Sequence, residues 1–235
     1  MRIGYRYMKS KNILNSSFIF CIFVLSFFFT SFAGLWKEEG GTWSYVKEDG
    51  SYPVNQWMWV DGNLDGYAEC YCFDEDGYCL IDTTTPDGYT VDVNGAWTVN
   101  GAVQRRLSVS GTLRYYDKRT GLARLYAQEA GGIILSMYNE NVQFAVLNLE
   151  QERILTITDG NSEEEYNDKV SQIHFRVKSE NIGYWEQTIP PSWRDYQNKK
   201  VTIVFLEDKP RFWDNSGEPL DAVGCWENNV RIYTN

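Results

Sequence analysis

Histidine and cysteine are the residue types that could support nucleophilic catalysis, and this sequence has few of either. His174 is the single histidine, and a thiol hydrolase would need it beside Cys225. In residues 172–178 apolar and polar residues alternate, which is typical of a strand with His174 on a solvated face together with Arg176 and Lys178. One histidine also leaves zinc sites and histidine-based triads incomplete. The pattern therefore predicts no catalytic role for His174.

Carboxylates near tryptophans are the second group that could act chemically. Glycoside cleavage needs two acids across a sugar-binding cleft. In residues 105–235, four acids lie within two positions of a tryptophan: Glu186 near Trp185, Asp195 near Trp193, Asp214 near Trp213, and Glu227 near Trp226. They are scattered along loop-like sequence, so we expect no catalytic residue. A cell-wall-directed glycoside hydrolase is the alternative hypothesis.

Two acidic segments have explanations other than catalysis. Ser162 and Glu165 have the spacing of a capping box, which predicts a short helix there. Residues 61–69 resemble the first half of a calcium loop, with oxygen donors at Asp61, Asn63, Asp65 and Glu69. The twelfth position of that loop is Cys72 instead of glutamate, and the flanking sequence is typical of strands. We therefore predict no metal and no cofactor, with calcium at an irregular site as a minor alternative.

Four cysteines lie outside the N-terminal segment 1–33: Cys70, Cys72, Cys79 and Cys225. An even number in an exported chain permits two disulfides. A four-residue turn over 74–77 would place Cys72 opposite Cys79, and directly opposed strand residues come close enough for a bridge. We predict a Cys72–Cys79 disulfide, while the pairing of Cys70 and Cys225 stays open. A zinc site here would lack a fourth local ligand.

Short aromatic segments repeat between residues 34 and 104. Segment 43–52 aligns with segment 70–79, and a third, degenerate copy over 89–97 aligns in turn with 71–79. Each copy has Asp-Gly or Asn-Gly after alternating apolar residues, which is typical of a β-hairpin. A lone hairpin is marginal in water, so we expect each unit to stack its aromatic rings on its neighbours.

Residues 34–104 resemble the choline-binding or glucan-binding repeats of Gram-positive surface proteins. The matching segments are 34–37, 41–50, 56–62, 68–78 and 86–92. The resemblance implies a β-solenoid of hairpins with ligand pockets between units, and choline on teichoic acid or a polysaccharide sugar as the ligand. Aromatic cages hold quaternary ammonium groups by cation–π attraction, and flat ring faces accept sugars. The ligand-binding residues implied are Trp36, Trp43, Tyr45, Trp57, Trp59 and Tyr71.

The second unit departs from this pattern. Cys70 and Cys72 stand where the first unit has Trp43 and Tyr45, so one aromatic wall is incomplete. The alternative is that the aromatic residues only pack hairpin against hairpin.

The N-terminal segment and the charge predict where the protein works. Residues 1–33 have the basic start, apolar run and small residues of a secretion signal, with an uncleaved membrane anchor as the alternative. They contain four basic and no acidic residues, so the remainder has 18 Lys and Arg against 32 Asp and Glu, a net charge of −14. Such a surface makes nucleic acid a poor partner. We expect a secreted, wall-associated protein.

From residue 105 onward longer alternating runs replace the repeats. The candidate strands are 122–126, 133–138, 142–149, 154–158, 173–177, 201–206 and 230–233. Seven short strands indicate an antiparallel β-sandwich or small barrel. The sequence thus predicts an all-β chain with a signal peptide at 1–33, hairpin repeats at 34–104 and a β-rich domain at 105–235 that binds something or acts as a spacer.

Overall fold

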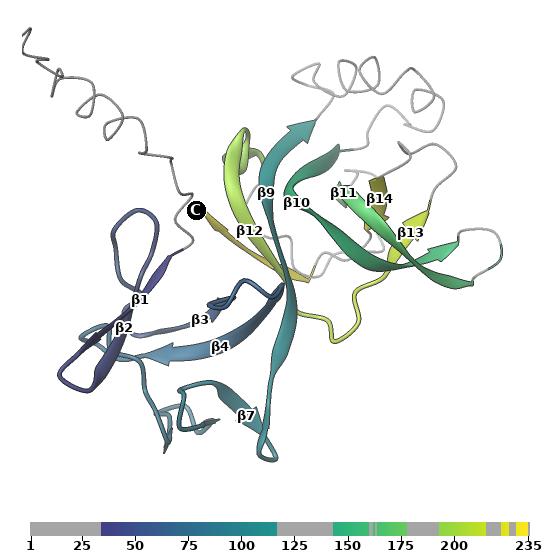
Figure 1. The fold of residues 1–235 in the computed structure, drawn as a ribbon. Helices are drawn as coiled ribbons and strands as arrows, with labels where there is room; N and C mark the ends of the chain where they lie inside the picture. The colour runs from purple at the N-terminus through teal and green to yellow at the C-terminus, as the bar shows by residue number, and fades with distance from the viewer. Residues whose placement is uncertain are drawn as a thin grey trace, which may run out of the picture. The chain divides into compact units, whose positions relative to one another are not determined.

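The computed structural model describes residues 34–116, 143–159, 162, 164–177, 193–214, 222–225 and 229–234. In these residues the chain forms strands and one short 3-10 helix, η2 (Trp193–Tyr196), which confirms the all-β class (Figure 1). No helix in this part of the chain is long and apolar enough to cross a membrane. The predicted signal segment lies outside the described residues.

Segment 34–104 folds into short antiparallel strands. β1 pairs with β2, β3 pairs with β4, and β5 to β8 form a four-stranded sheet in chain order. The strands are β1 (Leu35–Glu39), β2 (Thr42–Val46), β3 (Gln56–Val60), β4 (Tyr67–Phe73), β5 (Thr83–Thr84), β6 (Thr90–Val91), β7 (Trp97–Val99) and β8 (Ala102–Val103).

One five-residue turn recurs four times in this segment. In the turns at 47–51, 74–78, 85–89 and 92–96, the first N–H donates to the carbonyl of the fifth residue. The fourth residue is a glycine that donates to the carbonyl of the first, and its φ lies between 79° and 91° in all four. The Asp-Gly and Asn-Gly pairs of the sequence therefore supply the positive φ that was predicted for them.

Neighbouring units also contact one another in a repeating way. Ser44 forms an isolated antiparallel bridge with Tyr78, and Tyr71 forms one with Ala96. Ser44 and Tyr71 occupy the same position in the first and second copies of the repeat, and Tyr78 and Ala96 occupy the same position in the second and third. Each strand before a turn thus pairs with the residue that ends the next unit's turn. A continuous solenoid stays a prediction.

The turn at 74–78 corrects the predicted register of the cysteines. Phe73 pairs with Cys79, and the N–H of Leu80 donates to the carbonyl of Cys72. The turn therefore spans 74–78 instead of 74–77, and a slip of one residue moves each side chain to the other face of a strand. Cys70, Cys72 and Cys79 are free, buried thiols. The predicted Cys72–Cys79 disulfide is therefore wrong.

The C-terminal segment is built on longer strands. They are β9 (Arg105–Tyr116), β10 (Gln143–Asp159), β11 (Glu165–Val177), β12 (Lys199–Phe205), β13 (Phe212–Asp214), β14 (Ala222–Cys225) and β15 (Val230–Thr234). β9 lies between β10 and β12, and β12 continues to β15 (Figure 1). The N-terminal end of β9 pairs with β4, so one strand joins the repeats to this sheet.

Two parallel pairs correct the expectation of a purely antiparallel sheet. β10 and β11 form an antiparallel hairpin whose pairing slips between Asn148 and Arg153. β13 runs parallel to β10, β14 runs parallel to β11, and β13 pairs with β14. These four strands therefore close a small ring of pairings.

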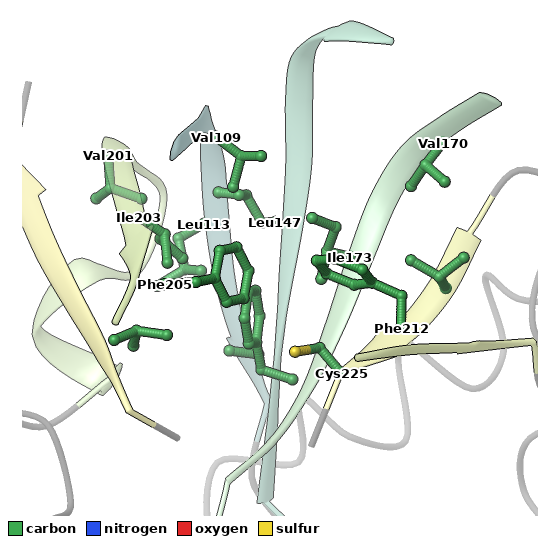
Figure 2. Packing of buried hydrophobic residues seen from close by; sticks show 14 of the residues in the cluster. Val109, Leu113, Leu147, Val170, Ile173, Val201, Ile203, Phe205, Phe212 and Cys225 are labelled. Atoms are coloured by element: carbon green, nitrogen blue, oxygen red, sulfur yellow. The ribbon is translucent and has the colours of Figure 1, made fainter. Parts of the chain in front are cut away.

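The core lies on the inner face of this sheet. Val201, Ile203 and Phe205 alternate along β12 and are fully buried. They meet Leu113 of β9 and Leu147 of β10 in one apolar cluster, as Figure 2 shows. Burying side chains of this size stabilises the fold by about 1.5–3 kcal/mol each.

Most predicted strands of the C-terminal segment that can be compared exist, with different lengths. Predicted strands 142–149 and 154–158 are parts of the single strand β10, and 173–177 ends β11. Predicted strands 201–206 and 230–233 match β12 and β15, whereas 122–126 and 133–138 lie outside the described residues. The helix expected at 162–165 is wrong, because Glu165 begins β11. Ser162 donates its N–H to Asp159 Oδ1 and accepts from Glu164, so its capping bonds close a hairpin instead.

Candidate ligand-binding site

Three of the predicted ligand residues meet between the first hairpin and β4, with Trp36 in contact with both tyrosines. The Trp36 ring lies 5.3 Å from Tyr45 and 4.7 Å from Tyr71, measured between centroids, and it stacks on Phe73. Tyr45 and Phe73 are buried, and burial raises the pKa of Tyr45 to about 12. These contacts favour the packing role that the alternative hypothesis gave to this group.

A second aromatic group is formed by rings from β3, from the turn at 85–89 and from β7. Trp97, the first residue of β7, lies 6.5 Å from Trp57 and 5.8 Å from Tyr89, and Tyr89 lies 5.9 Å from Trp57. The ring planes are inclined to one another by 65°, 86° and 90° respectively. Tyr89 is 50% exposed, so the group reaches the surface. We call Trp57, Tyr89 and Trp97 the three-ring site.

Sequence reasoning named only one member of the three-ring site. Trp57 was a predicted ligand residue, whereas Tyr89 and Trp97 belong to the third, degenerate copy of the repeat. Trp97 occupies the position in the third copy that Cys79 occupies in the second, and this alignment was the signal that could have identified it.

Trp59 borders the three-ring site, because its ring centroid lies 6.1 Å from that of Trp97. The guanidinium carbon of Arg106 lies 5.5 Å from the Trp59 ring centroid, and the Trp59 backbone N–H donates to the Tyr233 hydroxyl at 3.2 Å. Arg106 also pairs with Asp208 at 2.9 Å. A cation of the protein itself thus occupies one face of Trp59. Trp43 lies on β2 and is 43% exposed.

Charge and apolar surface are both concentrated in segment 34–104. This segment has two lysines, no arginine and thirteen acidic residues, whereas 105–235 has 16 basic and 19 acidic residues. Among the described residues, every exposed large hydrophobic side chain except Ile154 and Tyr166 belongs to segment 34–104. An acidic surface rich in exposed rings suits a ligand that is both cationic and apolar.

The calcium-like loop binds an arginine. The guanidinium of Arg105 pairs with Asp65 and, at 2.7 Å, with Glu69. Both carboxylate oxygens of Asp61 accept backbone N–H groups of the loop, and Asn63 donates to Asp65 at 3.0 Å. In the described part of the chain, no three His, Cys, Asp or Glu residues are arranged to hold a metal ion. The loop's oxygen donors therefore have a structural explanation.

His174 and Cys225 lie on adjacent strands and face opposite sides. Cys225 pairs in register with Phe175, and both lie in the apolar core. His174 is one position earlier, and its Nε2 lies 3.3 Å from Gln172 Oε1. The expectation that His174 is solvated is wrong, because it is only 5% exposed on a strand that lies between β10 and β14. The register therefore places the thiol and the imidazole on opposite faces of the sheet.

The two acids near tryptophans in the described residues of 105–235 have different surroundings. Trp193 is buried in the core, 5.0 Å from the Phe175 ring, while Asp195 is exposed on η2. Asp214 accepts a hydrogen bond from the Tyr166 hydroxyl at 2.8 Å. The other predicted acids and their tryptophans lie outside the described residues: Trp185, Glu186, Trp226 and Glu227.

Comparison with known proteins gives matches among solved structures. No family model and no curated protein matches the chain. The choline-binding domain of a Streptococcus pneumoniae protein is 30% identical, over 27% of this chain and 93% of that domain, with a TM-score of 0.17. The Cpl-1 endolysin complexed with a peptidoglycan analogue is 18% identical, over 58% of this chain and 38% of the endolysin, with a TM-score of 0.25.

A further match is the pneumococcal cell-wall endolysin from phage Cp-1 complexed with choline. It is 18% identical, over 58% of this chain and 32% of the endolysin, with a TM-score of 0.24. The chain therefore spans 38% or less of the endolysins that it matches. Two of these three neighbours are described with choline.

Proposed function

We propose that this chain is an exported, noncatalytic cell-surface protein that attaches to cell-wall polymer through its aromatic repeats. The polymer is choline-bearing teichoic acid or polysaccharide, and the C-terminal segment binds a partner or acts as a spacer. The observation that carries the proposal is the three-ring site, where Trp57, Tyr89 and Trp97 meet at steep angles near the surface.

Steeply inclined rings suit an onium ligand for a geometric reason. If three rings form the walls of a corner and their centroids are about 6 Å apart, one point lies about 4 Å in front of all three faces. A quaternary ammonium group at that point would be attracted by each ring quadrupole while its methyl groups contact apolar carbon.

The charge distribution supports the same class of ligand. Segment 34–104 has thirteen acidic residues against two lysines, so its surface attracts cations and repels free phosphate. The acidic surface therefore attracts a polymer that presents choline outward more strongly than it attracts a bare polyphosphate chain.

Retention on purified Gram-positive cell walls tests the proposal. The whole chain is used, because β4 of the repeats pairs with β9 of the C-terminal segment. We expect the wild type to sediment with walls and the triple variant Trp57→Ala, Tyr89→Ala, Trp97→Ala to remain in solution. Tyr89→Leu alone, which keeps apolar volume at an exposed position, should weaken retention without unfolding the chain.

Two matched variants test which exposed aromatic rings belong to the binding surface. Tyr166→Ala removes an exposed ring from β11 and should leave retention unchanged, whereas Trp43→Ala asks whether the exposed tryptophan of β2 contributes. Equal retention of the wild type and the folded triple variant would refute the three-ring site. Release of reducing sugar ends from the walls would refute the noncatalytic role.

A further inference from the structure

We propose that Asp87 is a positioning and specificity-determining residue of the three-ring site, where its carboxylate selects a cationic ligand over an uncharged one. The inference rests on the proposed function, because it names the ligand class of the same site. Asp87 was not among the residues that the sequence resemblance implied as ligand-binding.

Asp87 connects the two elements that carry the rings. The indole N–H of Trp57 on β3 donates to Asp87 Oδ2 at 2.8 Å. The hydroxyl of Thr85 donates to Asp87 Oδ1 at 2.6 Å, so each carboxylate oxygen has its own donor. Trp57 and Asp87 are far apart in the sequence, and the contact therefore fixes the turn at 85–89 against β3.

The same turn sets the place of Tyr89. The Tyr89 N–H donates to the buried Thr85 hydroxyl oxygen at 3.1 Å, and the Thr85 N–H donates to the Tyr89 carbonyl at 2.8 Å. One continuous set of hydrogen bonds thus runs from the Trp57 indole through Asp87 and Thr85 to the backbone of Tyr89. Such a set orients two of the three rings before a ligand arrives, which reduces the entropy lost on binding.

The Asp87 carboxylate also remains charged. The hydrogen bonds from Thr85 and Trp57 hold its pKa below the ordinary value for an aspartate. Both donors are uncharged, and in the described residues no salt bridge to Asp87 is formed. The negative charge beside the Trp57 ring is therefore available to a ligand cation.

A charge at this position distinguishes between the two ligand classes that the repeats resemble. Ring faces attract a sugar and an onium group alike, but only the onium group gains from a nearby carboxylate. Two opposite unit charges several ångströms apart at a protein surface change an affinity by about fourfold. Asp87 thus favours choline-like groups over uncharged ones.

Paired titrations of the full chain with choline and with 3,3-dimethylbutan-1-ol test this inference. This alcohol, called dimethylbutanol below, is the uncharged carbon analogue of choline. For the wild type we expect tighter binding of choline than of dimethylbutanol. Asp87→Asn keeps the shape and one acceptor for Trp57 but removes the charge, so it should weaken choline about fourfold and leave dimethylbutanol unchanged. Asp87→Ala should weaken both ligands, because the Trp57 indole loses its acceptor as well.

Asp76→Asn is the matched control, since it removes one carboxylate from an exposed turn of the same segment. It should change neither affinity. If Asp87→Asn lost as much affinity for dimethylbutanol as for choline, the role of Asp87 would be purely structural. If Asp76→Asn lost as much affinity for choline as Asp87→Asn does, the effect would come from the overall negative charge of the segment. Each result overturns the inference. The indole N–H resonance of Trp57 should stay in place in Asp87→Asn and shift in Asp87→Ala, which checks the positioning role separately.

Failure of this inference differs from failure of the proposed function. If the wild type is retained on walls while Asp87→Asn binds choline and dimethylbutanol as the wild type does, the attachment function stands and the role of Asp87 is refuted. If the wild type is not retained on walls and binds no choline, both are refuted.

Discussion

Two equivalent turn glycines should respond very differently to the addition of one methyl group. Gly88 and Gly95 each occupy the fourth position of a five-residue turn, with φ of 91° and 83°. A Cβ at Gly88 would have no atom within 4 Å. A Cβ at Gly95 would lie 2.7 Å from Cys79 Sγ and 3.1 Å from the Leu80 carbonyl oxygen.

The two costs follow from these surroundings. Gly88→Ala adds only the strain of a positive φ, so the free energy of unfolding should fall by about 1–2 kcal/mol. Gly95→Ala adds the same strain and a clash with packed backbone, and overpacking of this kind costs typically about 1–3 kcal/mol more. A total of about 3 kcal/mol is a large part of the roughly 5–15 kcal/mol by which domains are stable.

Urea denaturation followed by tryptophan fluorescence measures both changes. The chain has nine tryptophans, and Trp97, which follows the Gly95 turn closely, contributes to the emission that is measured. Gly50→Ala is the matched control, because Gly50 has a φ of 79° and its Cβ would also meet no atom within 4 Å. It should behave like Gly88→Ala.

Two outcomes would contradict this reasoning. If Gly95→Ala were no more destabilising than Gly88→Ala, the turn at 92–96 would not pack against Cys79 as the structure has it. If Gly88→Ala and Gly50→Ala were both neutral, these turns would not require a positive φ.

Three further predictions concern the core, the alkaline pH range and the thiols. Phe205→Ala should lower the free energy of unfolding by about 3–5 kcal/mol, because its ring is fully buried; an unchanged urea midpoint would contradict the core. Burial raises the pKa of Tyr233 to about 12. Its contribution to the free energy of unfolding should therefore be constant below the unfolded pKa of about 10 and be lost as the pH rises from there through 12. Urea denaturation at several alkaline pH values measures this loss. Burial also raises the pKa of Cys70 and Cys79 to about 12, so thiol reagents should modify them only after unfolding; rapid labelling of the native protein would disagree.

The sequence by itself determined the local features of this protein. Period-two alternation marked β12 and β15, and Asp-Gly or Asn-Gly pairs marked turns that place Gly50, Gly77 and Gly95 at positive φ. The alignment of the repeat copies reappears in the bridges that join neighbouring units. Each of these depends on a few adjacent residues and on the steric preferences of the backbone, which sequence records directly.

Only the tertiary structure decided which distant residues meet. A turn that differs by one residue from the predicted one separated Cys72 from Cys79, and flanking strands buried His174, whose alternation alone suggested exposure. Trp57 meets Asp87 from a distant part of the sequence, because strand register and the stacking of one unit on the next bring β3 to the turn at 85–89. Register and stacking arise from packing over the whole sheet, and a local pattern of residue types does not specify them.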